Sequence, residues 1–226
     1  MPALDVLGRF RPRSRLSPMK IDSAGVPLIV SALVPAVVLS ALQLFVWTVP
    51  FLALAGVLMF FFRDPDRQTS SRAQDVISPA DGRVMVAGAP PPNAAPDGEW
   101  VQLGIFLSPL DVHVNRIPVT GRVARVDYRR GGYRAAYRPE ATTENERNEI
   151  WIDAERWVVV FRQITGVLVR RVVCRVRPGD QVRAGDRFGV MKFGSRIDLF
   201  LPAGSRLLVG VGDRVRAGET ILAELN

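Results

Sequence analysis

The stretch that most constrains the fold runs from Val26 to Phe62 and carries no charged side chain. A helix that spans a bilayer needs about 20 apolar residues. The stretch is therefore too long for one upright span and slightly short for two. Its middle holds the polar Gln43 and a proline. We expect a membrane-embedded helical hairpin, with arms over roughly 26–45 and 47–62, that either crosses twice or dips into one leaflet.

The charges around this stretch predict its orientation. Lys20 precedes it and Arg63 comes directly after it. Because basic residues mark the cytoplasmic side, both ends should lie there, which a hairpin satisfies and a single crossing does not. We expect the chain at the cell membrane, with the part C-terminal to the hairpin on the cytoplasmic side. A cleaved signal peptide fits less well, because the stretch is over-long and has no small-residue cleavage site after it.

Beyond the apolar stretch the chain changes to short segments of β type. They are separated by glycine, proline and aspartate, and no convincing amphipathic helix interrupts them. Regular short strands with turn signals predict an all-β barrel or sandwich. The fold class is therefore mainly β, with residues 1–25 as a basic N-terminal arm, 26–62 as the membrane hairpin and 63–226 as a β-rich domain. The expected strands cover 82–87, 100–107, 121–128, 149–152, 157–163 and 167–176.

Composition limits the partners and the chemistry. Lys+Arg number 30 against 22 Asp+Glu, which favours contact with phosphate in nucleic acid or on an anionic membrane. The basic residues accompany a membrane segment and no aromatic-basic stacking pattern appears, so nucleic acid is not an expected partner. The single Cys174 excludes an internal disulfide, and with only one histidine, His113, no metal site is expected.

Near the C-terminus the chain repeats itself. The sequence G-D-Q-V-R-A-G-D at 179–186 returns as G-D-R-V-R-A-G-E at 212–219. Two strand-turn units with the same turn chemistry favour a C-terminal half like the flattened barrel of biotinyl or lipoyl carriers. In such a carrier Lys192 would be the modified residue, since Met191-Lys192 resembles the biotin acceptor site. A membrane-tethered carrier is therefore one alternative.

The centre of the C-terminal part is Gly194-Ser195. It separates an apolar run, 188–193, from an alternating one in which Ile197, Leu199 and Leu201 are apolar. A glycine tolerates backbone angles closed to other residues and leaves its carbonyl open to close approach. The Ser195 hydroxyl comes directly after that carbonyl in the chain. Taken alone, the pair is more typical of a bulge or tight corner in a sheet with a polar residue at the bend.

Six short motifs in order give this pair a more specific meaning. Together the motifs resemble those of the phosphatidylserine decarboxylase proenzymes of the short bacterial and archaeal type. They run in order from about Phe60 to Pro202, a range that covers most of the chain beyond the apolar stretch. The motifs are F-F-R-D-P at 61–65, S-P-A-D-G at 78–82, F-L-S-P-L-D-V-H at 106–113, N-E-R-N at 145–148, R-Q-I-T-G at 162–166 and M-K-F-G-S-R-I-D at 191–198.

The resemblance implies that the chain cuts itself between Gly194 and Ser195. The Ser195 hydroxyl would add to the Gly194 carbonyl, an N-to-O acyl shift would give an ester, and elimination would leave a pyruvoyl group as the covalent cofactor. The products would be a large chain, 1–194, and a small chain, 195–226, held together as a heterodimer. The pyruvoyl ketone would serve as the electron sink for loss of CO2 from phosphatidylserine, a substrate that stays in the membrane.

The resemblance also implies site residues. His113 would transfer protons in maturation, decarboxylation or both. Asp81 would orient or charge the base for self-cleavage. Larger members carry a second histidine three residues after the first, where this chain has Arg116, so the identity of that base is open.

Arginines are the expected headgroup ligands, because a guanidinium binds phosphate and carboxylate in a bidentate way. Arg147, Arg162 and Arg196 are the candidates. A second alternative is a membrane-anchored hydrolase with a Ser195–Lys192 dyad. A separation of three in a strand places those side chains on opposite faces, which disfavours it. The sequence leaves open whether the protein forms a homo-oligomer.

Overall fold

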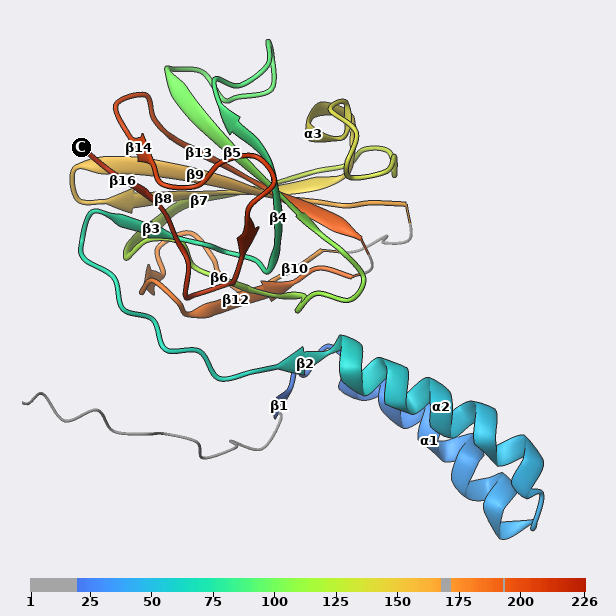
Figure 1. The fold of residues 1–226 in the computed structure, drawn as a ribbon. Helices are drawn as coiled ribbons and strands as arrows, with labels where there is room; N and C mark the ends of the chain where they lie inside the picture. The colour runs from blue at the N-terminus through green and yellow to red at the C-terminus, as the bar shows by residue number, and fades with distance from the viewer. Residues whose placement is uncertain (1–19, 168–171, 193) are drawn as a thin grey trace, which may run out of the picture.

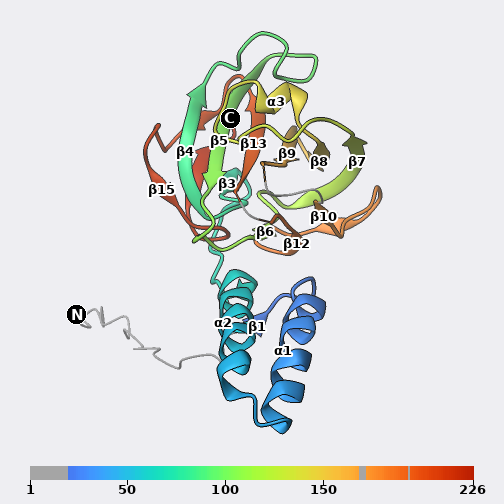
Figure 2. The same cartoon turned by 90° about the vertical axis from the view of Figure 1, so that its right-hand side faces the viewer.

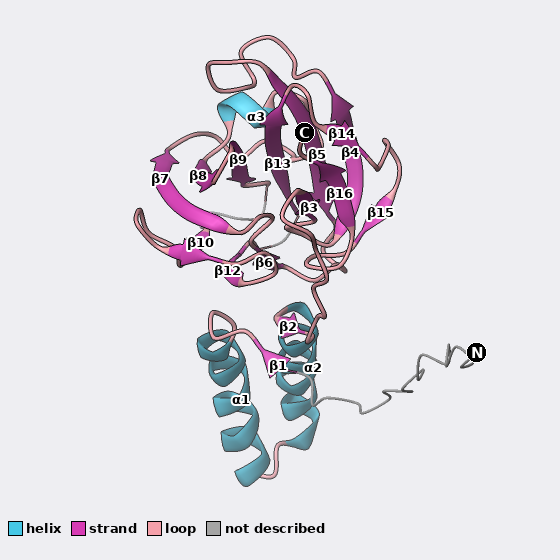
Figure 3. Ribbon diagram, turned by 90° about the vertical axis from the view of Figure 1, so that its left-hand side faces the viewer, coloured by secondary structure: helices cyan, strands magenta, loops and turns pink. Residues whose placement is uncertain are grey.

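The computed structural model describes residues 20–167, 172–192 and 194–226. The N-terminal basic arm predicted for 1–25 therefore lies almost wholly outside the described residues. Strands form one part of the molecule and two helices form another, as Figures 1 and 3 show. The chain is mainly β, as the sequence predicts.

Two helices occupy the uncharged stretch. They are α1 (Val26–Ala41) and α2 (Phe45–Phe61), and both views in Figures 1 and 2 show them side by side. The turn between them falls at 42–44, earlier than the sequence indicates. Among the described residues no helix, neither the 16 residues of α1 nor the 17 of α2, has the length and apolar character needed to cross a membrane.

The open end of this helix pair is closed by a short antiparallel sheet. Here β1 (Lys20–Ile21) pairs with β2 (Arg63–Asp64). Asp22 then accepts two hydrogen bonds from Arg175 of the β-rich part, at 2.9 and 2.6 Å. This bidentate contact joins the base of the helix pair to the strands.

The strands of the β-rich part form three sheets. The largest has eight strands in the order β11-β7-β8-β9-β13-β5-β4-β15, and two further sheets have the orders β10-β12-β6 and β14-β16-β3. All pairings between these strands are antiparallel. The large sheet is open, since its edge strands β11 and β15 do not pair with each other, so no closed barrel forms among the described residues.

Five of the six expected strands are present with boundaries shifted by a few residues. The sixth, 167–176, overlaps residues outside the described ones, and only β10 is assigned within it. A short helix, α3 (Ala141–Glu144), precedes β8. The strands are β3 (Asp75–Ile77), β4 (Gly82–Gly88), β5 (Trp100–Leu107), β6 (Val114–Arg116), β7 (Gly121–Arg129), β8 (Arg147–Ala154), β9 (Trp157–Ile164), β10 (Val173–Cys174), β11 (Gln181–Val182), β12 (Arg187–Val190), β13 (Ser195–Pro202), β14 (Arg206–Leu207), β15 (Arg214–Val215) and β16 (Ile221–Glu224).

The main core lies on one face of the large sheet. Side chains alternate along β13, so Ile197, Leu199 and Leu201 join the core while Arg196 and Asp198 face the other way. A second apolar cluster joins the end of α2 to β6 and β12, and contains Phe61, Phe62, Val112, Val114 and Val190. This second cluster places the exit of the helix pair next to the loop that carries His113.

The two copies of the C-terminal repeat form equivalent turns. Gly179 and Gly212 have φ of 98° and 100°. Their short strands, β11 and β15, add to opposite edges of the large sheet. This placement explains the repeat as two edge-strand units, while a carrier-like C-terminal half stays a prediction.

Candidate functional site

Ser195 is the first residue of β13 and lies in the middle of the large sheet. Its Cα is paired with Leu107 of β5, and β9 pairs along the other side of β13. The residue is fully buried, and among the described residues its Oγ has no hydrogen-bond partner. Gly194 before it has φ of 69°, a left-handed conformation that glycine adopts without strain. A buried hydroxyl with no partner is uncommon and marks a group available for chemistry.

The carbonyl of Gly194 is packed closely against Gly166, which lies just beyond β9. A Cβ placed on residue 166 would lie 1.9 Å from the Gly194 carbonyl oxygen, a distance that no side chain could adopt. Glycine at 166 is thus required for the backbone at 194 to lie where it does. The preceding Thr165 is fixed by two hydrogen bonds, from its N–H and its hydroxyl, to the Glu146 carbonyl, each 3.0 Å.

His113 lies just after the turn between β5 and β6. In this turn the Asp111 carboxylate accepts the Ser108 N–H at 2.8 Å, and the Asp111 carbonyl lies 2.9 Å from His113 Nδ1. In the neutral ring this bond puts the proton on Nδ1 and leaves Nε2 as a lone-pair acceptor. That Nε2 is buried and has no partner in the part of the chain that the structure describes. Burial lowers the pKa of His113 to about 4, and the Asp111 carbonyl and charge only partly oppose this.

Two contacts connect His113 to its surroundings. The Met191 N–H donates to the His113 carbonyl at 3.1 Å, which ties the histidine to the segment leading to Gly194. The Phe61 ring at the end of α2 packs on the imidazole with centroids 4.1 Å apart. The site is therefore in direct contact with the helix pair.

Buried amides form a polar row on the core face of the sheet. Asn148 Nδ2 donates to Gln163 Oε1 at 3.4 Å, and Gln163 Nε2 donates to Asn115 Oδ1 at 2.9 Å. The Asn115 Nδ2 is buried and has no partner. Because Gln163 is paired with Ile197, two residues along β13 from Ser195, the row runs close to the serine.

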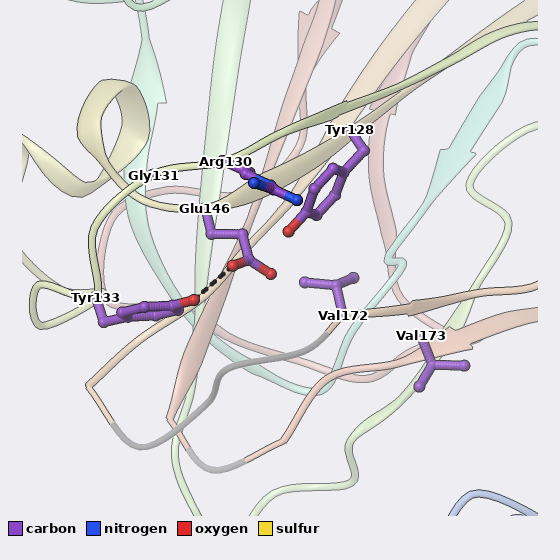
Figure 4. Close-up of a pocket in the computed structure, with 7 residues that line it drawn as sticks. All are labelled: Tyr128, Arg130, Gly131, Tyr133, Glu146, Val172 and Val173. Carbon is purple, nitrogen blue, oxygen red and sulfur yellow. Dashed lines mark hydrogen bonds between the residues drawn. The ribbon is translucent and has the colours of Figure 1, made fainter.

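A pocket of about 430 Å³ opens at the same end of the sheet; we call it the Glu146 pocket. Figure 4 shows its side chains, with the Tyr133 hydroxyl donating to Glu146 at 2.7 Å. Glu146 precedes β8 by one residue, so alternation places it on the same face as Asn148 and the core. The pocket is lined by Tyr128, Arg130, Gly131, Tyr133, Glu146, Val172 and Val173.

Asp81 is bonded to other parts of the chain. Its carboxylate accepts hydrogen bonds from Arg67 at 2.9 Å and from the Ala217 N–H at 2.8 Å. Among the described residues no hydrogen bond or ion pair joins it to His113 or Ser195. Its predicted part in self-cleavage stays a prediction.

Arg116, which stands where a second histidine occurs in larger members, binds segments that are distant in the sequence. Its guanidinium donates to the Gly185 carbonyl at 3.0 Å and to the Pro65 carbonyl at 2.9 Å, and lies 3.4 Å from the Asp64 carboxylate. These bonds hold the segment after α2 against the sheet. A guanidinium used in this way has no acceptor to offer as a base.

The three arginines predicted for the headgroup lie on the opposite face of the sheet from Ser195. Arg196 is paired with Asp198 at 2.5 Å and is buried. Arg162 is bonded to Glu149 and to the Ala94 carbonyl. Arg147 donates to the Thr143 carbonyl at 2.5 Å. Their role in binding a headgroup stays a prediction, and their partners in this structure are structural ones.

Lys192 faces the helix pair. Its Nζ lies 5.8 Å from the centre of the Phe62 ring, and the residue is partly buried. A carrier would need this lysine at an exposed hairpin tip, and a hydrolase would need it bonded to Ser195, whose Oγ has no partner. Neither alternative gains support from this placement.

The sequence alone does not single out Gly166, Glu146, Gln163 or Asn115. The first three lie inside the motifs at 145–148 and 162–166, and Asn115 lies two residues beyond the motif that ends at His113. The motifs draw attention to this part of the chain. Within them, positive charge favours the arginines as candidate headgroup ligands. Only alternation along the strands, known from the register, separates the residues facing the site from those facing away.

The chain is similar to known proteins over most of its length. Residues 54–223 match the family model described as phosphatidylserine decarboxylase. Among the relatives is a phosphatidylserine decarboxylase proenzyme of Nitrosomonas eutropha, 40% identical over 90% of this chain and 94% of its own length. That of Aromatoleum aromaticum is 41% identical over 89% of this chain and 94% of its own, and that of Chlorobium luteolum 40% identical over 76% and 80%. Together with the buried Gly194-Ser195 junction, these matches show that the chain belongs to the phosphatidylserine decarboxylase family.

Proposed function

We propose that this chain is a proenzyme that cuts itself at Gly194-Ser195 and then decarboxylates phosphatidylserine to phosphatidylethanolamine and CO2. Family membership supports the reaction, and the names of the relatives describe proenzymes. One observation carries the assignment of the site: Ser195 Oγ is buried without a partner among the described residues and directly follows a carbonyl that is held against Gly166. His113, whose buried Nε2 also lacks a partner among them, is bonded through its carbonyl to Met191 in the segment that leads to this junction.

Self-cleavage uses groups of the chain and one water molecule. Ser195 Oγ adds to the Gly194 carbonyl carbon and passes its proton to a base. The C–N bond then breaks as the nitrogen takes a proton, which leaves an ester. Removal of the Ser195 Cα proton with cleavage of the Cβ–O bond releases the Gly194 carboxylate and leaves dehydroalanine, which water hydrolyses with release of ammonia.

His113 is the group best suited to receive the first proton. Its low pKa keeps the ring neutral at pH 7, so Nε2 has a lone pair, and the ring is held by Asp111 and Phe61. Protein groups that act as bases need this lone pair and a position near the proton. We assign to His113 the proton transfers of maturation and of turnover.

The site fits the pyruvoyl group that the family implies. Residue 195 is buried beside acceptors and amides rather than fixed by a partner of its own. The group, once formed, supplies a ketone that reacts with the substrate amine and accepts the electrons released with CO2. The surrounding core of β5, β9 and β13 would keep water from residue 195.

Cleavage would leave the two products in one sheet. The small chain, 195–226, contains β13, which pairs with β5 and β9, and β16, which pairs with β3. These partner strands belong to the large chain. A stable heterodimer is therefore expected without any new contact.

The helix pair would hold the enzyme at its substrate. Its outer side chains are apolar and exposed, including Val46 at 81%, Val37 at 67% and Trp47 at 67%. Surfaces of this kind are stable when covered by protein or lipid. We propose that they lie in the cell membrane and that the strands lie on its cytoplasmic side, within reach of the headgroup.

The function is tested by measuring CO2 from carboxyl-labelled substrates. The purified protein should release CO2 from phosphatidylserine in vesicles, and much less from free serine. The Ser195→Ala variant should release none, while a Ser205→Ala variant, changed at a serine outside the junction, should match the unaltered protein. Equal release by the Ser195→Ala variant would remove residue 195 from the mechanism.

A further inference from the structure

We propose that the Glu146 pocket is the site that selects the serine headgroup, with the Glu146 carboxylate binding its ammonium group. The inference rests on the proposed function and assigns a substrate-recognition residue to it. It differs from the expectation for Arg147, Arg162 and Arg196, which lie on the opposite face of the sheet.

The first argument is the charge of Glu146. The residue is 5% exposed. The Tyr133 hydroxyl is bonded to one carboxylate oxygen, and Figure 4 shows the other oxygen directed toward the space between Tyr128 and Val172. Within the described part of the chain no arginine or lysine forms an ion pair with it. A buried carboxylate without a cation is costly, and a cationic ligand would offset that cost.

The second argument is the position of the pocket relative to residue 195. The Glu146 carbonyl binds both the N–H and the hydroxyl of Thr165. The next residue, Gly166, packs against the Gly194 carbonyl. The wall of the pocket is thus fixed to the backbone that holds the junction, so an amine bound at Glu146 lies on the same side of the sheet as the reacting group.

The third argument is the route from the membrane. Val173 on the pocket wall also packs against the cluster that contains Phe61 and Phe62. A lipid held beside the helix pair could therefore extend its headgroup past Val173 toward Glu146. Arg130 also lines the pocket, so the pocket presents both charges, as a headgroup with an ammonium, a carboxylate and a phosphate requires.

The test uses the uncut full-length Ser195→Ala protein in detergent, in which no reaction can occur. Calorimetry would measure binding of three soluble headgroups: glycerophosphoserine, glycerophosphoethanolamine and glycerophosphoglycerol. Adding Glu146→Gln keeps the acceptor for Tyr133 and removes the charge. We expect it to weaken binding of the two amine-bearing headgroups about tenfold or more, the size of a charge-assisted hydrogen bond, and to leave the glycerol headgroup unchanged.

The matched control is Glu144→Gln, which removes an equal charge two residues away. Glu144 pairs with Arg134, and both side chains are about half exposed. Binding of all three headgroups should be unchanged in it. Equal affinity of the Glu146→Gln and parent proteins for glycerophosphoserine would overturn the inference, as would a parent protein that shows no preference for amine-bearing headgroups. Because none of these measurements needs cleavage or CO2 release, they can fail while the proposed function stands.

Discussion

Burial gives His113 its chemistry. The imidazole lies between the Phe61 ring and the turn at Asp111, and these surroundings hold its pKa at about 4 instead of 6.5. A histidine of ordinary pKa is already mostly neutral at pH 7, so burial extends the neutral form of His113 to lower pH and makes the ring a weaker base. The contact with α2 contributes to this burial.

The same shift predicts how stability depends on pH. Because the folded pKa lies below the unfolded one, the unfolded chain binds more protons between pH 6.5 and 4, and stability is lost as pH falls through that range. The shift corresponds to about 3 kcal/mol. In uncut Ser195→Ala protein, denaturant unfolding at pH 7 and pH 4 should show this loss. Adding His113→Asn should reduce the loss by about that amount, whereas the same pH dependence in both proteins would mean that His113 is not buried in its neutral form.

At the scale of single residues the sequence predicts which residues can react better than it predicts which face of the sheet their side chains are on. Ser195 and His113 can be proposed from motifs, because few serines come after a glycine in such a setting and only one histidine exists. Arg162 and Arg196 are candidates for their charge, but each is bonded to a carboxylate on the face away from Ser195. The face of a residue depends on strand register, which short motifs do not contain.

Two elements meet at the junction, the end of β9 and the start of β13. Their backbones approach so closely at Gly166 and Gly194 that only hydrogen fits between them. Thr165, fixed to the Glu146 carbonyl, holds the end of β9 in place. We infer that this contact positions the Gly194 carbonyl for attack by Ser195.

Gly166→Ala tests this role. The added methyl must displace the Gly194 carbonyl, and a shift of about 1 Å can lower a rate about 100-fold, so self-cleavage should slow by about that factor. The measurement is the fraction of cut chain over time after synthesis. Gly204→Ala is the control, since a Cβ there meets nothing within 4 Å, and it should cut normally.

Hydroxylamine distinguishes a variant that cannot form the ester from one that forms the ester but fails at a later step. Hydroxylamine cleaves esters, so it should split a chain that has completed the acyl shift. If Gly166 positions the carbonyl, the Gly166→Ala protein should resist hydroxylamine. Cleavage at normal speed, or accumulation of an ester, would contradict the role given to Gly166.

Helices and strands are predictable to different degrees. The uncharged stretch predicts two helices because no polar face interrupts it, yet the turn falls at 42–44, where Gln43 has φ of 60°. Alternation and turn residues predict the strands β4, β5, β7, β8 and β9. Short strands such as β10 and β14 depend on their partners in the sheet and leave little pattern in the sequence.

At the scale of the whole molecule, the two chains produced by cleavage would stay together. Residues on either side of Gly194-Ser195 pair across the large sheet and across the sheet of β3 and β16. The sequence predicts a mainly β fold but not this open eight-stranded order, because the pairing of distant strands is set by the shared core. A broken backbone at 194 would leave that core intact.

On the proposed placement in the membrane, the helix pair would determine where the whole molecule acts. Arg175 and the Phe61 cluster fix the strands to the base of the pair. The substrate, which stays in the membrane, and His113, which packs on the end of α2, would then lie close together. This arrangement accounts for apolar helices and a buried reaction site in one chain.

The central claim is that the backbone between residues 194 and 195 is cut to make a ketone. Intact-mass measurement of the purified active protein tests it most directly. We predict two polypeptides, 1–194 and 195–226, with the smaller one lighter by one ammonia than the encoded sequence and closed to N-terminal sequencing until the ketone is aminated. An active preparation consisting of one uncut chain of 226 residues would contradict the account.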